Sequence, residues 1–171
     1  PQTTIPKFKA FKNGWFQVQD EAAQLVSLHL NPQPGETVLD ACAGYGGKTG
    51  HIAQLMKNKG AILASDINPK KLLQLESEMR RLGVSIVSTQ CRNLKRPFNR
   101  EYYGIYDRVL IDAPCSGLGV MRRNPDIKWL NYKKDLVQFK QTQIQLIHNL
   151  AVLVKPNGIL LYSVCSPEPE E

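Results

Sequence analysis

Two cysteines follow the carboxyl ends of two expected strands, and thiols at such positions can react with a bound ligand. Cys115 belongs to the sequence Asp112-Ala-Pro-Cys115, directly after the apolar run 108–111, and Cys165 comes two residues after the run 159–163. The carboxyl ends of parallel strands share one edge of a sheet, so both thiols should reach that edge. A single cysteine is more often an inert apolar side chain. Two cysteines at one polar edge indicate that a thiol reacts with a ligand bound there.

Methylation of carbon 5 of a pyrimidine is a reaction that requires such a thiol. That carbon is a poor nucleophile until a thiolate adds to carbon 6 and gives the ring enamine character. Asp112, if it is protonated or shares a proton with ring nitrogen 3, could stabilise the charge that develops during this addition. Lys48 could lower the pKa of a neighbouring cysteine and orient Asp112.

A glycine-rich segment between a strand and a helix predicts a cofactor site at the same edge. The sequence Asp40-Ala-Cys42-Ala-Gly44-Tyr-Gly46-Gly47-Lys48-Thr49 leaves the run 37–39 and enters a helical pattern, where glycines let the backbone approach a ligand. Its spacing differs from that of a nucleoside triphosphate loop. Asp66 ends the next strand, roughly 20 residues beyond the glycines, and is placed to accept hydrogen bonds from ribose hydroxyls. Together these features favour a cofactor that carries a ribose.

Alternating strand and helix patterns predict the sheet that positions these segments. Apolar runs bounded by turn residues predict five strands, at 37–39, 61–65, 84–89, 108–111 and 159–163, the last after a turn at 156–158. Helical spacing and capping residues predict helices at 21–30, from the glycine segment to 57, at 69–82 and at 135–154. This order indicates an α/β fold, a Rossmann-like doubly wound sheet that is mainly parallel and covered on both faces.

Length and charge limit the classes of protein to consider. The chain has 171 residues, enough for one sizeable core but short for two, so we expect one domain over residues 1–171. Lys and Arg number 22 against 15 Asp and Glu, and this net charge of +7 favours a polyanionic partner such as nucleic acid. No apolar run is long enough to span a bilayer and the start lacks the layout of a signal peptide, so we expect no membrane association and a cytoplasmic location.

The remaining candidate ligands give no sign of a metal site. The four cysteines lack the spacing of zinc ligands and have no nearby histidines, so neither a metal nor a disulfide framework is expected. His29, His51 and His148 lie on helical patterns without a cluster of partners. We interpret all three as structural or surface residues.

Five ordered motifs resemble those of the Sun (Nop2/Sun) family of RNA (cytosine-5)-methyltransferases, and within it the bacterial enzymes that act on small-subunit ribosomal RNA. The resemblance covers nearly the whole chain. Its motifs are the segment 14–23, the cofactor loop 40–49, the Asp-Ala-Pro-Cys motif 112–119, the substrate-side segment 122–129 and the last segment 162–171. In methyltransferase sheets of this type two further strands follow the fifth, and the family usually carries an N-terminal RNA-binding domain. Neither is visible in the sequence, so we interpret the chain as a fragment.

The resemblance implies that S-adenosyl-L-methionine is the cofactor. Its methionine and ribose parts would be held by Cys42, Ala43, Gly44, Tyr45, Gly46, Gly47 and Lys48. Asp66 would bind the ribose hydroxyls, and Asp112 would face both the cofactor methyl group and the target base. Gln90 stands where the family commonly has an acid after the third strand, so the adenine would be bound by an amide. Gly44 and Tyr45 replace the usual Ala-Pro.

The resemblance also assigns different roles to the two thiols. Cys165, in the last motif, would be the covalent nucleophile, and Cys115 would assist release of the methylated product. Val164 replaces the threonine that usually stands beside the nucleophile, which removes a hydroxyl group and should have a modest effect on rate.

Basic residues near the expected reaction edge would hold the RNA. Arg122, Arg123 and Lys128 follow the Asp-Ala-Pro-Cys motif and are the predicted phosphate contacts. Trp129 would either stack on a nucleotide or pack in the core, and Arg80 and Arg81 are interpreted as part of a solvated helix face. The expected partner is ribosomal RNA, with transfer RNA as the alternative, and the target cytosine must be unpaired or flipped out. The chain is expected to be a monomer.

Three other functions remain open at the level of sequence. A DNA cytosine methyltransferase would use Cys115 as its nucleophile, because the Pro-Cys dipeptide bears it in those enzymes, and the second thiol argues against this alternative. A non-catalytic RNA-binding scaffold with a retained cofactor pocket would fit the departures at Gln90 and Val164. A small-molecule methyltransferase would leave the basic charge and the paired cysteines unexplained.

Overall fold

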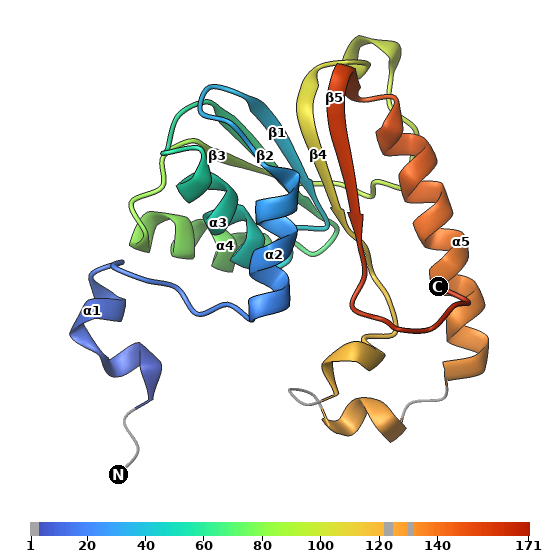
Figure 1. Cartoon of the computed structure of the whole chain (residues 1–171), viewed down its shortest axis with the longest axis horizontal. Coiled ribbons are helices and arrows are strands. Elements are labelled where there is room, and N and C mark those ends of the chain that lie inside the picture. The colour runs from blue at the N-terminus through green and yellow to red at the C-terminus, as the bar shows by residue number, and fades with distance from the viewer. Residues whose placement is uncertain (1–3, 122–124, 130–131) are drawn as a thin grey trace.

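Five parallel strands form one sheet at the centre of the molecule (Figure 1). The computed structural model describes residues 4–121, 125–129 and 132–171, and the side chains of residues 128 and 132–135 are outside that description. The strands are β1 (Thr37–Ala41), β2 (Ala61–Asp66), β3 (Val87–Cys91), β4 (Tyr106–Asp112) and β5 (Val154–Ser163). Their spatial order is β3-β2-β1-β4-β5, and every neighbouring pair is parallel. The expected Rossmann-like fold is confirmed.

Helices cover both faces of this sheet. They are α1 (Lys9–Lys12), α2 (Glu21–Leu30), α3 (Gly47–Leu55), α4 (Pro69–Arg81) and α5 (Tyr132–Ala151), with short 3-10 turns at Ile5–Lys7, Arg100–Tyr102, Leu118–Val120 and Pro125–Trp129. Figure 1 shows α2, α3 and α4 on one side of the strands and α5 on the other. No helix that the structure describes is both long and apolar enough to cross a membrane.

Each face of the sheet has its own apolar core, because successive side chains of a strand point to opposite faces. On one face Leu39 and Ile111 pack with Leu150 of α5. On the other face the neighbouring residues Val38 and Leu110 pack with the buried sides of α2 and α3. The helix α4 covers β2 and β3 through a third cluster. The strands are therefore held in register from both sides, and their carboxyl ends form one fixed edge.

Local sequence signals set the helix ends as expected. Asp20 accepts a hydrogen bond from the backbone N–H of Ala22 at 3.1 Å, and α2 has the predicted bounds 21–30. Asn68 accepts one from the N–H of Lys70 at 3.0 Å, and Pro69 is the first residue of α4. Short polar side chains at these positions satisfy N–H groups that the first turn leaves without partners.

Three elements have boundaries that differ from the prediction by three residues or more, and the other predicted boundaries are within two residues of the structure. The third strand begins at Val87 rather than at residue 84, because the chain first closes α4 with a turn in which the N–H of Val84 bonds to the oxygen of Met79. The long helix spans Tyr132–Ala151 rather than 135–154. The strand β5 begins at Val154, before the predicted turn at 156–158. Its register jumps there, since Tyr106 pairs with Val154 and Arg108 with Ile159, so the turn is accommodated as an irregularity within the strand.

Candidate active site

The two thiols predicted to meet at the sheet edge lie side by side. Cys115 follows β4 and Cys165 follows β5, and these strands pair in parallel up to Asp112 and Ser163. The two Sγ atoms are 3.2 Å apart. The backbone N–H of Cys165 also donates to the Sγ of Cys115 at 3.3 Å. Cys165 is exposed and Cys115 is half-buried, so the pair is open to a ligand.

The contact between the sulfurs separates the pKa values of the two thiols. The hydrogen bond from Cys165, together with the N–H groups of Cys165 and Gly117, lowers the pKa of Cys115 to about 7 against the effect of burial. The same hydrogen bond raises the pKa of Cys165, because the proton is held between two sulfurs, and the partial shielding of this sulfur from water adds to the rise. The pair therefore loses one proton near neutral pH and holds the other between the two sulfurs.

The last segment of the chain is clamped onto the loop that carries Cys115. The N–H and the hydroxyl of Ser116 both donate to the carboxylate of Glu171, at 2.8 and 2.7 Å. The N–H of Gly119 donates to the oxygen of Cys165 at 2.9 Å. These bonds connect the loops that follow β4 and β5. The distance between the two sulfurs is therefore set by contacts between the loops as well as by the pairing of the strands.

Lys48 and Asp112 form the expected ion pair beside this loop. Lys48, in the first turn of α3, places its Nζ atom 2.6 Å from the Oδ2 atom of Asp112, at the end of β4. The side chains are 17% and 34% exposed, so the pair is partly shielded from water. Lys48 contacts only the Oδ2 atom of Asp112, and this contact fixes the direction in which the carboxylate points.

The glycine segment is held open by its backbone conformation and by Asp66. Gly44 and Gly46 have positive φ angles of 58° and 84°. Asp66 accepts hydrogen bonds from the N–H of Gly44 at 2.9 Å and from that of Asn68 at 2.8 Å. A Cβ atom at Gly46 would stand 2.6 Å from the Cγ of Leu75, so only glycine lets the loop lie this close to α4.

Two adjoining cavities, of about 290 and 600 Å³, run along the carboxyl ends of the strands. Both are lined by Cys42, Lys71 and Asp112. Of the predicted cofactor residues, the following line one or both: Cys42, Ala43, Gly44, Tyr45, Gly47, Lys48, Asp66 and Asp112. Gly46 is buried beneath the loop and lines neither of them. Burial raises the pKa of Cys42 to about 12, so this thiol contributes shape rather than reactivity.

Gln90 is one predicted cofactor residue that the structure does not bring to the crevice. Its side chain is exposed on β3, and it is not among the residues that line either cavity. Asn93, three residues further along, lines the smaller cavity together with Ile67 and Arg92. The chain reaches the cavity only after β3 ends. A sequence pattern cannot predict to within three residues where this happens.

Sequence reasoning also missed one charged residue that lines the crevice, Lys71, and did not single out Asp40, a buried acid at the start of the cofactor loop. Lys71 lines both cavities from the first turn of α4, and its ammonium group lies 5.7 Å from the centre of the Tyr45 ring. Asp40 is 1% exposed, and burial raises its pKa to about 7 despite a hydrogen bond from the hydroxyl of Thr49 at 2.6 Å. Its other oxygen, Oδ1, has no hydrogen-bond partner among the residues that the structure describes. The signal that could have identified Lys71 was its position in the first turn of the helix that follows Asp66, the acid at the end of β2.

The predicted RNA contacts are only partly within the structure. Arg122 and Arg123 lie outside the described residues, and Lys128 lies on the short helix Pro125–Trp129 with its side chain outside the description. Trp129 is 77% exposed, so it does not pack in the core. Arg81 is not a solvated surface residue, because its side chain is 14% exposed and donates to the carbonyl oxygens of Phe11 and Phe16.

The fold and the crevice together define the class of protein. A parallel sheet in the order β3-β2-β1-β4-β5 carries a glycine loop after β1, an acid at the end of β2 and reactive side chains after β4 and β5. This is the arrangement of a Rossmann-like methyltransferase, and S-adenosylmethionine, the cofactor expected from the sequence, is the cofactor of this class.

The chain belongs to the 16S rRNA methyltransferase RsmB/F family, whose model matches residues 27–171. It is 39% identical over 168 residues to the probable ribosomal RNA small subunit methyltransferase B of Bacillus subtilis, covering 98% of this chain and 38% of the relative. It is 39% identical over 163 residues to the ribosomal RNA small subunit methyltransferase B of Klebsiella pneumoniae, covering 94% of this chain and 37% of the relative. The family expected from the sequence is confirmed.

A solved structure extends this similarity to three dimensions. The crystal structure of NSun6 from Pyrococcus horikoshii with SFG superimposes with a TM-score of 0.87 at 30% identity, covering 99% of this chain and 43% of that chain. The chain thus spans well under half the length of each of these three relatives.

Proposed function

We propose that the chain carries the catalytic site of a ribosomal RNA (cytosine-5)-methyltransferase, part of a cytoplasmic monomer. The observation that carries the proposal is the pair of thiols, 3.2 Å apart, on the loops that follow β4 and β5. Asp112, which ends β4, and Pro114, which precedes Cys115, line the cofactor crevice. The names of the relatives, which are ribosomal RNA small subunit methyltransferases, support ribosomal RNA as the substrate. The net charge of +7 suits a polyanionic partner of this kind.

The residues of the crevice fit S-adenosylmethionine. A Cβ atom at Gly47 would meet no heavy atom within 4 Å, so the space above the loop is open to a ligand. Asp66 uses one lone pair of each oxygen on the loop and has others for ribose hydroxyls. We assign the adenine to Ile67 and Asn93 rather than to Gln90, because the first two line the cavity. The bound cofactor supplies an electrophilic methyl group.

Cys165 is the nucleophile in the proposed mechanism, and Cys115 prepares it. The thiolate of Cys115 accepts the proton of Cys165, and the sulfur of Cys165 forms a bond to carbon 6 of the cytosine. The electron pair of the 5,6 double bond becomes available at carbon 5. Asp112, oriented by Lys48, shares with ring nitrogen 3 a proton that comes from solvent, and this shared proton stabilises the charge on the ring.

Release of the product reverses the addition. Once carbon 5 carries the methyl group, its hydrogen must leave as a proton so that the double bond can form again and the bond from carbon 6 to Cys165 can break. Cys115 lies beside Cys165, and its pKa of about 7 lets it lose the accepted proton to solvent and act again as a base. This is the role in product release that the resemblance to the Sun family implies.

The test uses RNA that contains 5-fluorocytosine, because fluorine at carbon 5 blocks removal of the last proton and traps the covalent adduct. With the complete protein and S-adenosylmethionine, the wild type should form an adduct that survives denaturing electrophoresis, and Cys165→Ala should form none. Cys115→Ala should form the adduct more slowly, because Cys165 must then lose its proton to solvent instead of to Cys115. Loss of the adduct in Cys115→Ala but not in Cys165→Ala would assign the nucleophile to the Pro-Cys motif and overturn the mechanism.

The choice of substrate is tested by transfer of labelled methyl groups. Ribosomal RNA, transfer RNA and DNA are offered side by side to the complete protein. We expect 5-methylcytosine in ribosomal RNA alone. Label in transfer RNA or DNA would reassign the substrate, and tight binding of cofactor without transfer to any of them would favour the RNA-binding scaffold.

A further inference from the structure

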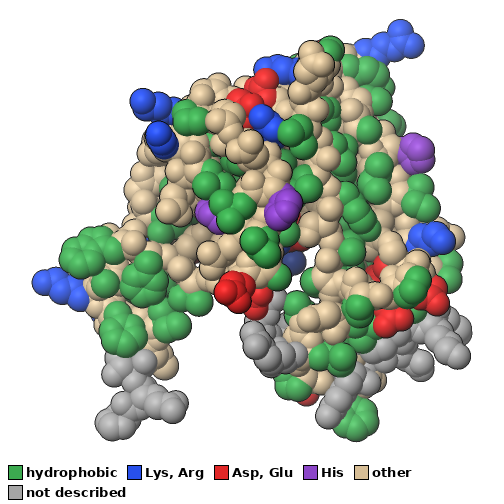
Figure 2. Space-filling view, in the orientation of Figure 1, with side chains coloured by type: hydrophobic (Ala, Val, Ile, Leu, Met, Phe, Trp, Pro, Cys, Tyr) green, Lys and Arg blue, Asp and Glu red, His purple; other side chains and the backbone are tan. Residues whose placement is uncertain are grey.

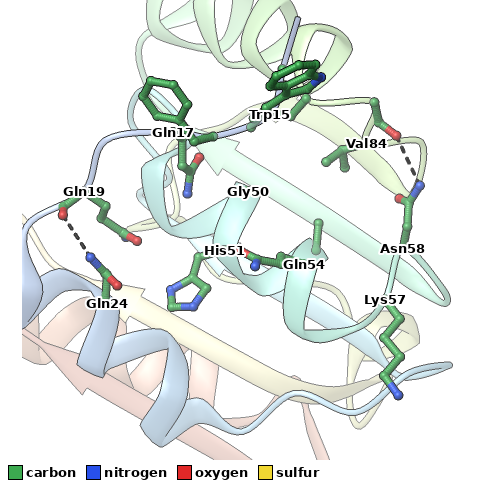
Figure 3. A pocket seen from close by; sticks show the side chains of 15 residues that line it. Trp15, Gln17, Gln19, Gln24, Gly50, His51, Gln54, Lys57, Asn58 and Val84 are labelled. Atoms are coloured by element: carbon green, nitrogen blue, oxygen red, sulfur yellow. Dashed lines mark hydrogen bonds between the residues drawn. The ribbon is translucent and has the colours of Figure 1, made fainter. Parts of the chain in front are cut away.

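A third cavity, of about 580 Å³, lies between the N-terminal segment, α2 and α3 (Figure 3). It adjoins the cofactor crevice, because Gln19 lines both, and the side chain of Gln17 donates to the oxygen of Gly47 in the cofactor loop at 2.9 Å. None of the residues given a catalytic role above lines it. Its volume lies within the ~300–1,000 Å³ range of sites for small ligands.

The wall that carries Trp15 is built by specific contacts. Arg81 donates to the oxygens of Phe11 at 2.6 Å and of Phe16 at 3.2 Å, and its guanidinium group stacks on the Phe11 ring at 3.8 Å. A Cβ atom at Gly14 would stand 1.9 Å from the backbone oxygen of Arg81, so the chain passes α4 as closely as glycine allows. The N-terminal segment is thus held firmly, although Trp15 itself is 76% exposed.

The cavity presents one flat apolar surface and several groups that can both donate and accept hydrogen bonds. Figure 3 shows Trp15 at its upper rim, with Gln54 and His51 projecting from α3. The Nδ1 atom of His51 is buried and has no hydrogen-bond partner among the described residues. Burial lowers the pKa of His51, so the imidazole is neutral and one ring nitrogen can accept while the other donates.

The charges at this cavity select the kind of ligand. Lys57 is its one charged lining residue within the part of the chain that the structure describes. Apolar side chains also gather on the surface beside it in Figure 2, over the N-terminal segment, where Ile5, Phe8, Phe16 and Val18 are exposed. An aromatic face, amides for the edge of a planar ring and a cation nearby are the elements with which proteins bind unpaired RNA bases.

We propose that this cavity binds an unpaired nucleotide of the substrate RNA near the target cytosine. The base stacks on Trp15, its edge bonds to Gln54 and His51, and Lys57 contacts a phosphate. This inference rests on the proposed function and adds a subsite to it. The cavity begins within one turn of α3 after Lys48 and meets the cofactor crevice at Gln19, so an RNA strand bound at the crevice can extend into it.

Kinetics of the complete protein test the subsite. Trp15→Ala and Gln54→Ala should each raise the KM for ribosomal RNA about 10-fold, because stacking and edge contacts of one base are lost, and leave kcat and the Kd for S-adenosylmethionine unchanged. The matched control is Gln74→Ala, an exposed glutamine of α4 that does not line the cavity, and its KM should not change. Equal KM values in the wild type and both cavity variants would remove the subsite and leave the proposed function standing.

Fluorescence supplies a readout that does not depend on turnover. The described chain contains two tryptophans, so Trp129→Phe leaves Trp15 as its reporter, and Trp15→Phe gives the background of any others in the complete protein. Adding ribosomal RNA should quench the emission of Trp15 and protect it from acrylamide. Quenching of Trp15 by RNA without methyl transfer would refute the proposed function and support the RNA subsite. A Trp15 already shielded from acrylamide before RNA is added would mean that another part of the complete protein fills the cavity, and would overturn the proposal.

Discussion

Replacing Asp40 by asparagine should flatten the pH dependence of stability between about pH 4 and 7. Burial raises the pKa of this carboxyl group from 3.8 to about 7, and the side chain is 1% exposed. The folded state therefore holds the proton more tightly than the unfolded state does. The stabilisation is fully present below pH 3.8 and is lost as the pH rises through 7.

The expected magnitude follows from the size of the shift. Because the folded state binds one more proton than the unfolded state over this interval, the free energy of unfolding falls by about 1.4 kcal/mol per pH unit. Over the whole pKa shift the loss of stability amounts to about 4 kcal/mol. Asparagine cannot ionise, so Asp40→Asn loses this slope. Its absolute stability also changes, because the amide must replace the carboxyl group beside Thr49, and the slope rather than the value at one pH is the measurement.

Urea unfolding at several pH values from 4.5 to 7.5 supplies that slope for each protein. Asp107→Asn is the control, because hydrogen bonds from Lys155 and from the backbone of Thr37 lower the pKa of Asp107. Its contribution is lost only as the pH falls below 3.8, so this variant should keep the wild-type slope in the window. If plots of the free energy of unfolding against pH were parallel for the wild type and Asp40→Asn, Asp40 would be ionised in the folded state and the argument would be refuted.

Two further predictions concern the segments that frame the crevice. Arg81→Ala should destabilise the protein by about 2 kcal/mol and expose residues 5–19 to limited proteolysis, whereas Arg80→Ala, its exposed neighbour, should change stability by less than about 0.5 kcal/mol. Equal digestion of the two variants would contradict the role of Arg81. Gly46→Ala should weaken binding of S-adenosylmethionine in calorimetry about 10-fold more than Gly44→Ala, because both have positive φ but only Gly46 has a side chain within 3 Å of the added Cβ atom. Equal affinities would mean that the loop shifts freely.

The capping residues and the alternation of apolar runs were sufficient to predict the order of the elements and the edge where the motifs meet. The bounds of α2 agree because Asp20 and the turn after Leu30 are local signals. The start of β3 and the irregular start of β5 could not be predicted, because they depend on pairing with β2 and β4. Gln90 lies away from the cavities for a related reason, since the point at which β3 stops pairing with β2 decides which of the following residues reach the crevice.

The sequence by itself determined which chemical groups stand at the carboxyl edge, because parallel strands bring their ends together whatever packs around them. It could not determine that the two sulfurs lie 3.2 Å apart, that burial raises the pKa of Asp40 to about 7, or that Arg81 holds the N-terminal segment. Only the tertiary structure decided these features. Hydrogen-bond distance and removal from water depend on residues far apart in the chain, which no local pattern of residue types records.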